Sequence, residues 1–161
     1  MGECQYLFLR WICEPEDNRL RLVVEEARVQ TQKAVSYQNE AMREFAEIFQ
    51  GASPIESDPD CRLFEIIYNH YISYTVTNES YGKYPQPPEA FTGKLFREFQ
   101  WSYLLEWTRK VSYANDEHPG PGPLQHHEIV CQNHVLEVIT TESPIVRLID
   151  QQAVTMLVRP N

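Results

Sequence analysis

The sequence predicts an α+β fold, an antiparallel sheet of about five or six strands with two helices packed on it. Several segments alternate apolar and polar side chains with a period of two, most clearly over residues 61–81. Two others, near residues 38–50 and 101–112, repeat apolar side chains every three to four positions, the period of a helix. With 161 residues, 42% of them apolar and 23% charged, one globular domain over residues 1–161 is expected.

The N-terminal part of the chain predicts a β-hairpin. Residues 6–13 are almost continuously apolar, and residues 20–29 form the second strand after a loop of about five residues, EPEDN. Glu25 and Glu26 are adjacent in that strand, so one of them points toward apolar neighbours unless the buried face ends at Val24 or a bulge shifts the register. A buried carboxylate at this place would have a raised pKa and would be a candidate site residue.

The stretch Cys61–Tyr81 is predicted to be the central strand. One of its faces is apolar and aromatic apart from His70, whereas the other face is mixed and becomes polar. His70 is therefore either buried, with its ring nitrogens bonded to backbone or tyrosine hydroxyls, or part of a pocket. In a pocket it could act as an acid or base if the fold brings Glu26 or His134 close to it.

Two helices are expected beside the sheet. The first, residues 38–50, ends at Gly51, and the second, residues 101–112, comes after a proline-rich loop and a possible short strand at 93–99. The inward stripe of the second helix is predicted to consist of Trp101, Leu104, Leu105, Thr108 and Val111. The following HPGPGP segment is expected to be a rigid loop, because too little chain remains after it for another domain.

Residues 125–141 allow two interpretations. Apolar side chains change from odd to even positions here, which favours two strands joined by a turn at Gln132–Asn133 over a single helix. In a helix, His127, Cys131 and His134 would share one face as a zinc site requires, whereas in a hairpin they separate. His126 belongs to the same cluster. We favour the hairpin and predict no metal and no cofactor; the tail, 144–158, could add a strand or a helix.

The known catalytic motifs are absent from the sequence. It contains no P-loop, GxGxxG, GxSxG or HExxH motif and no EF-hand loop. No stretch approaches the roughly 20 apolar residues of a membrane helix, and the N-terminal residues lack the features of a secretory signal. The four cysteines are scattered, which is typical of reduced thiols. These observations favour a cytoplasmic protein.

Charge and aromatic content point to a binding role. The net charge is −9, and residues 1–60 alone contribute −6. Such a surface disfavours nucleic acid and anionic membranes and favours a basic protein partner, although it could also serve solubility alone. The candidate contact residues follow the central strand and begin the second helix: Asn78, Glu79, Tyr81, Tyr84 and Trp101.

Two functional hypotheses remain. The first is a non-enzymatic acidic binding protein, in the manner of an inhibitor or antidote of a basic protein. The second is a small metal-independent enzyme with an acid–base site formed by His70 with Glu26 or His134. A deep pocket containing His70 would favour the second hypothesis, whereas a flat acidic face and a filled core would favour the first. The sequence does not predict the oligomeric state.

Overall fold

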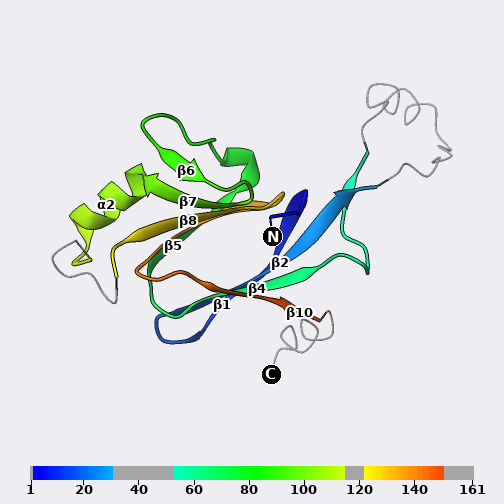
Figure 1. Ribbon diagram of the computed structural model, residues 1–161, viewed down its shortest axis with the longest axis horizontal. Helices are drawn as coiled ribbons and strands as arrows, with labels where there is room; N and C mark the ends of the chain where they lie inside the picture. Colours follow the sequence, from blue (N-terminus) through cyan, green and yellow to red (C-terminus); the bar gives the residue numbers. More distant parts are fainter. Residues whose placement is uncertain (1, 31–52, 115–121, 151–161) are drawn as a thin grey trace.

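The computed structural model describes residues 2–30, 53–114 and 122–150, which form two antiparallel sheets packed face to face (Figure 1). The first sheet has the order β1 (Tyr6–Glu16), β2 (Arg19–Val29), β4 (Leu63–Tyr68) and β10 (Ile145–Ile149), with β3 (Ile55–Glu56) paired to the end of β2. The second has the order β5 (Tyr71–Asn78), β9 (His134–Thr140), β8 (Gln125–Val130), β7 (Phe96–Trp101) and β6 (Ala90–Thr92). A 3-10 turn, η1 (Glu79–Tyr81), follows β5, and α2 (Tyr103–Val111) follows β7.

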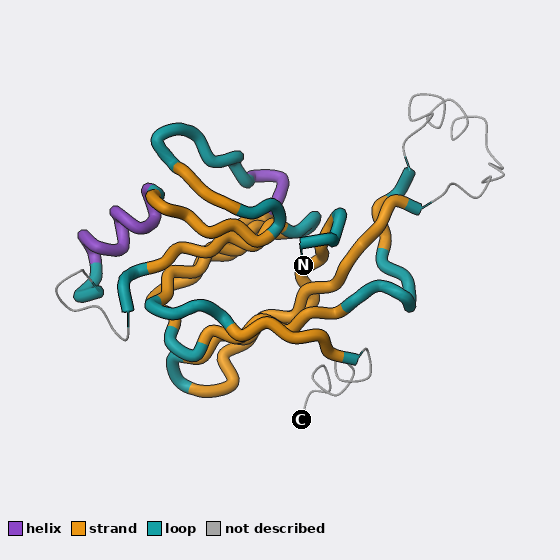
Figure 2. The backbone as a smooth tube through the Cα atoms, viewed as in Figure 1, coloured by secondary structure: helices purple, strands orange, loops and turns teal. Residues whose placement is uncertain are grey.

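The antiparallel character of the fold is confirmed, but its extent differs from the prediction. Two five-stranded sheets replace the single sheet of five or six strands, and strands dominate the described chain (Figure 2). The predicted helix at 101–112 is present as α2, whereas the one predicted at 38–50 lies outside the described residues. Nothing helical in the described ranges has the length and apolar composition that crossing a bilayer requires.

The predicted central strand is two strands. The stretch Cys61–Tyr81 bends at Asn69 and His70, so that β4 belongs to the first sheet and β5 to the second. Even positions face the core before the bend, at Tyr68, and again after it, at Tyr74, although a register shift between Tyr71 and Ser73 interrupts the alternation at the start of β5. Asn69 and His70 are the first adjacent pair of polar side chains in the stretch, and they mark the corner between the sheets.

The core lies between the two sheets. Alternate side chains of the facing strands fill it: Leu20, Leu22 and Val24 of β2, Phe64, Ile66 and Tyr68 of β4, and Ile129, Leu136 and Val138 of β8 and β9. Full burial of each such aliphatic or aromatic side chain stabilises the fold by about 1.5–3 kcal/mol. This core determines which side chains of β8 and β9 face outward, and those include the candidate site.

The N-terminal hairpin is confirmed and is tighter than expected. β1 extends to Glu16 and β2 begins at Arg19, so the turn has two residues, Asp17 and Asn18, in place of about five. Asn18 has φ 61°, a conformation that asparagine tolerates better than most residues. A register shift between Leu9 and Trp11 bulges β1, while β2 keeps a continuous register with β4 from Leu20 to Glu25.

Asn133 joins the two sheets at the edge of β1. Its Oδ1 accepts a hydrogen bond from Leu9 N at 2.9 Å, and its Nδ2 donates to Leu9 O at 3.0 Å. Gln132 N donates to Leu7 O at 2.7 Å beside this pair. The turn between β8 and β9 therefore satisfies backbone groups at an edge strand that would otherwise lack partners.

Replacing Asn133 with alanine should lower the free energy of unfolding by about 2 kcal/mol, because two hydrogen bonds to Leu9 are lost and their backbone partners stay part-buried. Chemical denaturation monitored by tryptophan fluorescence measures the change. Gln132→Ala is the matched control, since Gln132 contributes its backbone N–H and its side chain is exposed. Equal losses in the two variants would contradict this role of the Asn133 side chain.

Candidate functional site

The outward face of the second sheet holds a row of four polar side chains. Thr75, Glu137, Glu128 and Arg97 are successive cross-strand partners on β5, β9, β8 and β7, and we call them the carboxylate row. The next position along each of the two inner strands points into the core, so the row faces away from the first sheet. Directly opposed residues of antiparallel strands have Cβ atoms about 5 Å apart, which places Glu128 and Glu137 side by side.

Each member of the row has a defined partner. Arg97 Nη1 donates to Glu128 Oε2 at 2.5 Å, and Thr75 Oγ1 donates to Glu137 Oε2 at 3.0 Å. The other oxygen of Glu137, Oε1, lies 3.5 Å from His126 Nε2. Glu128 is buried at 4% exposure, whereas the side chain of Glu137 is 31% exposed and is the part of the row that a ligand can reach.

A third carboxylate approaches the row from the segment before β6. Glu89 Oε1 accepts a hydrogen bond from Tyr103 N, at the start of α2, at 3.3 Å. Its Oε2 accepts one from Gln86 N at 3.4 Å. A carboxylate is favourable at a helix N-terminus, and this interaction holds Glu89 within electrostatic reach of both Glu128 and Glu137.

Burial and mutual repulsion alter the titration of the cluster. Burial raises the pKa of Glu128 above its usual range; Arg97 opposes this change, and the charges of Glu137 and Glu89 add to it. Burial also raises the pKa of Glu137, with Glu89 adding to the effect and the Thr75 hydrogen bond opposing it. Burial lowers the pKa of His126 to about 4, so its ring is neutral at pH 7. Perturbed pKa values of this kind often mark functional sites.

Two elements flank the carboxylate row on the outward face. The first is the chain after η1, which passes over Val135 on one side of the row. A Cβ on Gly82 of this segment would lie 3.2 Å from Val135 Cγ2. On the other side lies Ile139, which packs with Leu105 of α2. Figure 1 shows η1, β6 and α2 on the side of the second sheet that faces away from the first.

Aromatic rings link these elements around the row. The guanidinium of Arg97 lies 4.9 Å from the centroid of the Tyr84 ring and 4.8 Å from that of Phe91. Phe91 contacts Phe99, whose ring stacks on His126 with centroids 4.3 Å apart. His126 Nδ1 in turn lies 2.8 Å from the hydroxyl of the N-cap residue of α2, so the helix and the row are coupled through one buried imidazole.

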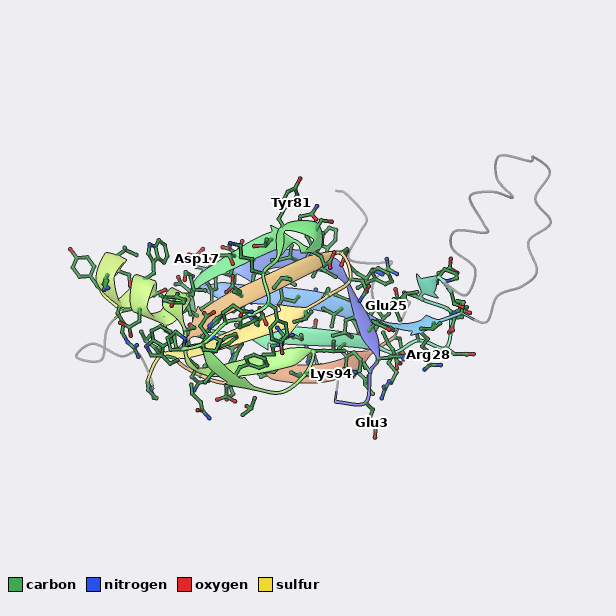
Figure 3. The ribbon with its side chains drawn as sticks, turned by 90° about the horizontal axis from the view of Figure 1, so that it is seen from above. Glu3, Asp17, Glu25, Arg28, Tyr81 and Lys94 are labelled. Atoms are coloured by element: carbon green, nitrogen blue, oxygen red, sulfur yellow. The ribbon has the colours of Figure 1, made fainter. Side chains whose placement is uncertain are left out.

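Further aromatic side chains on the same elements are open to solvent. Tyr81, Tyr84, Tyr103 and Trp107 are between 55% and 81% exposed. Trp101 is half-buried, with its ring edge-on to Tyr103 at 5.0 Å. We call these five residues the aromatic face. Figure 3 shows Tyr81 projecting from the body of the molecule.

The inward stripe of α2 is narrower than predicted. Leu105 and Thr108 are buried, but Val111 is exposed. Trp101 is the last residue of β7, so the helix begins after it, with Ser102 as the N-cap that accepts a hydrogen bond from Leu105 N. The other two predicted contact residues lie where β5 meets η1: Asn78 ends β5 and accepts a hydrogen bond from Ser80 N, and Glu79, the first residue of η1, is exposed.

The structure does not bring His70 and His134 together. His70 is exposed at the corner between β4 and β5, and its backbone oxygen accepts a hydrogen bond from Thr140 Oγ1. His134 pairs with Asn78 at the opposite end of β5, which at about 3.3 Å per residue is on the order of 25 Å from His70. No carboxylate among the described residues lies within ion-pair distance of the His70 ring.

Glu26 is buried as the sequence suggested, but the expected rise in its pKa is wrong. Arg62 donates to both of its oxygens, at 2.9 and 3.1 Å, and Arg28 donates at 3.2 Å. The hydrogen bonds from Arg62 are the main cause that lowers the pKa of Glu26 to about 2. Its neighbour Glu25 lies on the other face of β2 and pairs with Arg10 at 2.5 Å. Both carboxylates are thus paired, and Glu26 lies at the far end of β2 from the corner.

The hairpin interpretation of residues 125–141 is confirmed. His127 lies opposite Val138, and Cys131 N donates to His134 O, so these side chains do not converge. Within the described ranges, no group of three histidine, cysteine or acidic side chains could hold a metal ion. All four cysteines are free thiols.

Sequence reasoning missed the pairing of Glu128 with Glu137. The two residues are equally distant from the predicted turn at Gln132–Asn133, so the hairpin register alone could have placed them opposite each other. The neighbouring Arg97 could not be found in this way, because β7 is far from them in sequence. Comparisons of the chain with protein-family models, with characterised proteins and with solved structures found no significant match.

Proposed function

We propose that the protein is a non-enzymatic binding protein, in the manner of an inhibitor or antidote, that engages a basic protein partner through the aromatic face. The main support is the exposure of four large aromatic side chains from η1, the chain after it and α2: Tyr81, Tyr84, Tyr103 and Trp107. Large aromatic side chains normally bury most of their surface, and tyrosine and tryptophan are enriched where protein interfaces derive their binding energy.

The charge of the chain supports a basic partner. The net charge is −9, and on the outward side of the second sheet the carboxylates of Glu89, Glu128 and Glu137 lie within electrostatic reach of one another beside a single arginine, Arg97. A basic surface would be attracted at long range and would gain from burial against the aromatic rings. The same charge makes nucleic acid and anionic membranes unfavourable partners. The four free thiols suit a reducing compartment such as the cytoplasm.

The placement of the other candidate residues supports binding over catalysis. An acid–base site requires its groups within hydrogen-bond reach of one substrate. His70 lies in the turn between β4 and β5, far from both Glu26 and His134, and Glu26 is engaged by two arginines. The aromatic face, by contrast, presents several exposed rings from η1, the chain after it and α2 on the outward side of the second sheet.

Replacing Trp107 with alanine should weaken binding of a basic peptide about tenfold or more, because tryptophan is among the residues that contribute most to the affinity of an interface. Alanine favours helix, so α2 is retained. The measurement is fluorescence anisotropy of labelled basic, neutral and acidic peptides of equal length, at low and high salt. The basic peptide should bind tightest, and salt should weaken its binding.

Tyr113→Ala is the control for this experiment. Tyr113 is 97% exposed just beyond α2, and its ring has no ring partner among the described residues. Its removal should leave binding unchanged. Equal binding of acidic and basic peptides, or binding that salt does not affect, would contradict the proposal.

A further inference from the structure

Resting on the proposed function, we infer that the carboxylate row and Glu89 form a recognition site for an arginine side chain of the basic partner. The guanidinium would lie between Glu137 and Glu89, flanked by the exposed rings of Tyr84 and Tyr103. This site would recognise one chemical group, the guanidinium, whereas the aromatic face alone would give affinity without such specificity.

The first argument is an excess of negative charge. Three carboxylates, of Glu89, Glu128 and Glu137, interact with one another, and Arg97 is the cation paired with them in the described part of the chain. Arg97 Nη1 bonds Glu128, and its Nε donates to Lys94 O, so Glu137 and Glu89 remain without a cation partner. Half-buried carboxylates that repel one another are costly, and an incoming cation removes that cost.

A buried ring nitrogen beside the carboxylate row lacks a hydrogen-bond partner. His126 is 1% exposed, and its Nε2 has no hydrogen-bond partner, although it points toward Glu137 Oε1 at 3.5 Å. Buried polar atoms are rarely left without a partner. A ligand that draws the Glu137 carboxylate into a fixed position would allow this contact to shorten into a hydrogen bond, which ties the unsatisfied nitrogen to occupancy of the site.

The separated carboxylates and the aromatic rings around them favour a guanidinium over a metal ion. A compact metal ion needs several ligands converging on one point, and the described side chains offer no such group. A planar fork of N–H donors can bridge two separated carboxylates and stack on aromatic rings at the same time. Arg97 already shows this combination on the same surface, with its guanidinium against Tyr84 and Phe91 while it bonds Glu128.

Access restricts the contact to the outer members of the cluster. Glu128 is buried and already paired, so it acts through its charge, whereas Glu137 is partly open to solvent and Glu89 is half-buried. Direct hydrogen bonds to the ligand are therefore assigned to Glu137 and Glu89.

The test compares a capped arginine-rich peptide with its counterpart in which each arginine is replaced by neutral citrulline. The wild-type protein should bind the arginine peptide about tenfold or more tightly, because charge-assisted bonds are the stronger ones. Glu137→Gln should abolish this preference. Glu98→Gln is the matched control: it removes the same charge from the opposite face of β7 and should keep the preference.

The outcomes separate this inference from the proposed function. If neither peptide binds, the proposed function fails. If both bind equally, or if Glu98→Gln reduces the preference as much as Glu137→Gln does, binding stands but the arginine site is overturned. A lysine peptide that binds as tightly as the arginine peptide would overturn the assignment of a guanidinium. Circular dichroism of each variant verifies that it is folded.

Discussion

Replacing Glu26 with glutamine is expected to lower the free energy of unfolding by about 3 kcal/mol at neutral pH. Glu26 is buried, and Arg62 and Arg28 both donate to its carboxylate. Its pKa of about 2 lies well below the ordinary value of 4.5, which means that the folded protein favours the charged form by roughly that energy. The amide of glutamine keeps the shape of the side chain but removes the buried counter-charge of Arg62, whose other carboxylate partner among the described residues is the exposed Glu3 at 3.7 Å.

The pH dependence of this loss has a definite sign. A carboxylate whose pKa is lowered by folding stabilises the protein above its unfolded pKa and loses that contribution as pH falls through the folded value. The difference between wild type and Glu26→Gln should therefore be full above pH 4.5 and shrink toward pH 2. Urea denaturation across this range measures it.

Glu16→Gln is the control for the Glu26 experiment. Glu16 also pairs with an arginine, Arg19 at 3.3 Å, but its side chain is 69% exposed. Exposed pairs contribute about 0–1 kcal/mol, so this variant should remain close to wild type in stability. If Glu26→Gln were as stable as Glu16→Gln, the buried Glu26–Arg62 ion pair would contribute no more to the free energy of unfolding than an exposed pair does.

Much of the fold could be predicted because local patterns determine it. Apolar side chains at successive even positions mark the core faces of β2 and β4. This local pattern does not depend on which sheet the strand joins. The change of parity near Gln132–Asn133 placed the β8–β9 hairpin correctly, because a turn must separate two strands whose core positions differ in parity. Helix α2 was predicted to within two residues at its start.

The corner at Asn69 and His70 could not be predicted from the same pattern. A period of two continues unchanged when the chain passes from one sheet to the facing one, so a single long strand and two strands around a corner look alike. The same pattern makes His70 the leading candidate for a site residue, because His70 is the polar side chain on an otherwise apolar face. In the structure, His70 lies at the corner and is exposed to solvent, so it is not part of the apolar face.

The candidate site was hidden for a related reason. Its members come from four strands, and Arg97 joins Glu128 only through pairing of β7 with β8, which α2 separates in the sequence. Sequence reasoning can place Glu128 opposite Glu137 within one hairpin, but it cannot say that β5 and β7 border that hairpin. Long-range strand order is the information that the sequence patterns lack.

Acidification from pH 6.5 to pH 4 is expected to cost the folded protein up to about 3 kcal/mol through His126 alone. Burial holds the pKa of His126 at about 4, so between these pH values the unfolded chain binds a proton on this residue and the folded chain does not. Stability therefore falls as pH is lowered through that window. His127, whose pKa is also lowered by burial, acts in the same direction, whereas Glu128 and Glu137, whose pKa values are raised, act in the opposite one.

Because these groups titrate together, the contribution of His126 is isolated by comparing two variants with wild type. His126→Gln should show a weaker loss of stability between pH 6.5 and pH 4, since its side chain cannot take up a proton in the unfolded chain. His70→Gln removes an imidazole that is exposed in the folded protein and should follow the wild-type profile. Thermal unfolding across this pH range gives the comparison, at roughly 2–4 °C per kcal/mol for a chain of this size. A His126→Gln profile parallel to that of wild type would contradict the lowered pKa of His126 in the folded protein.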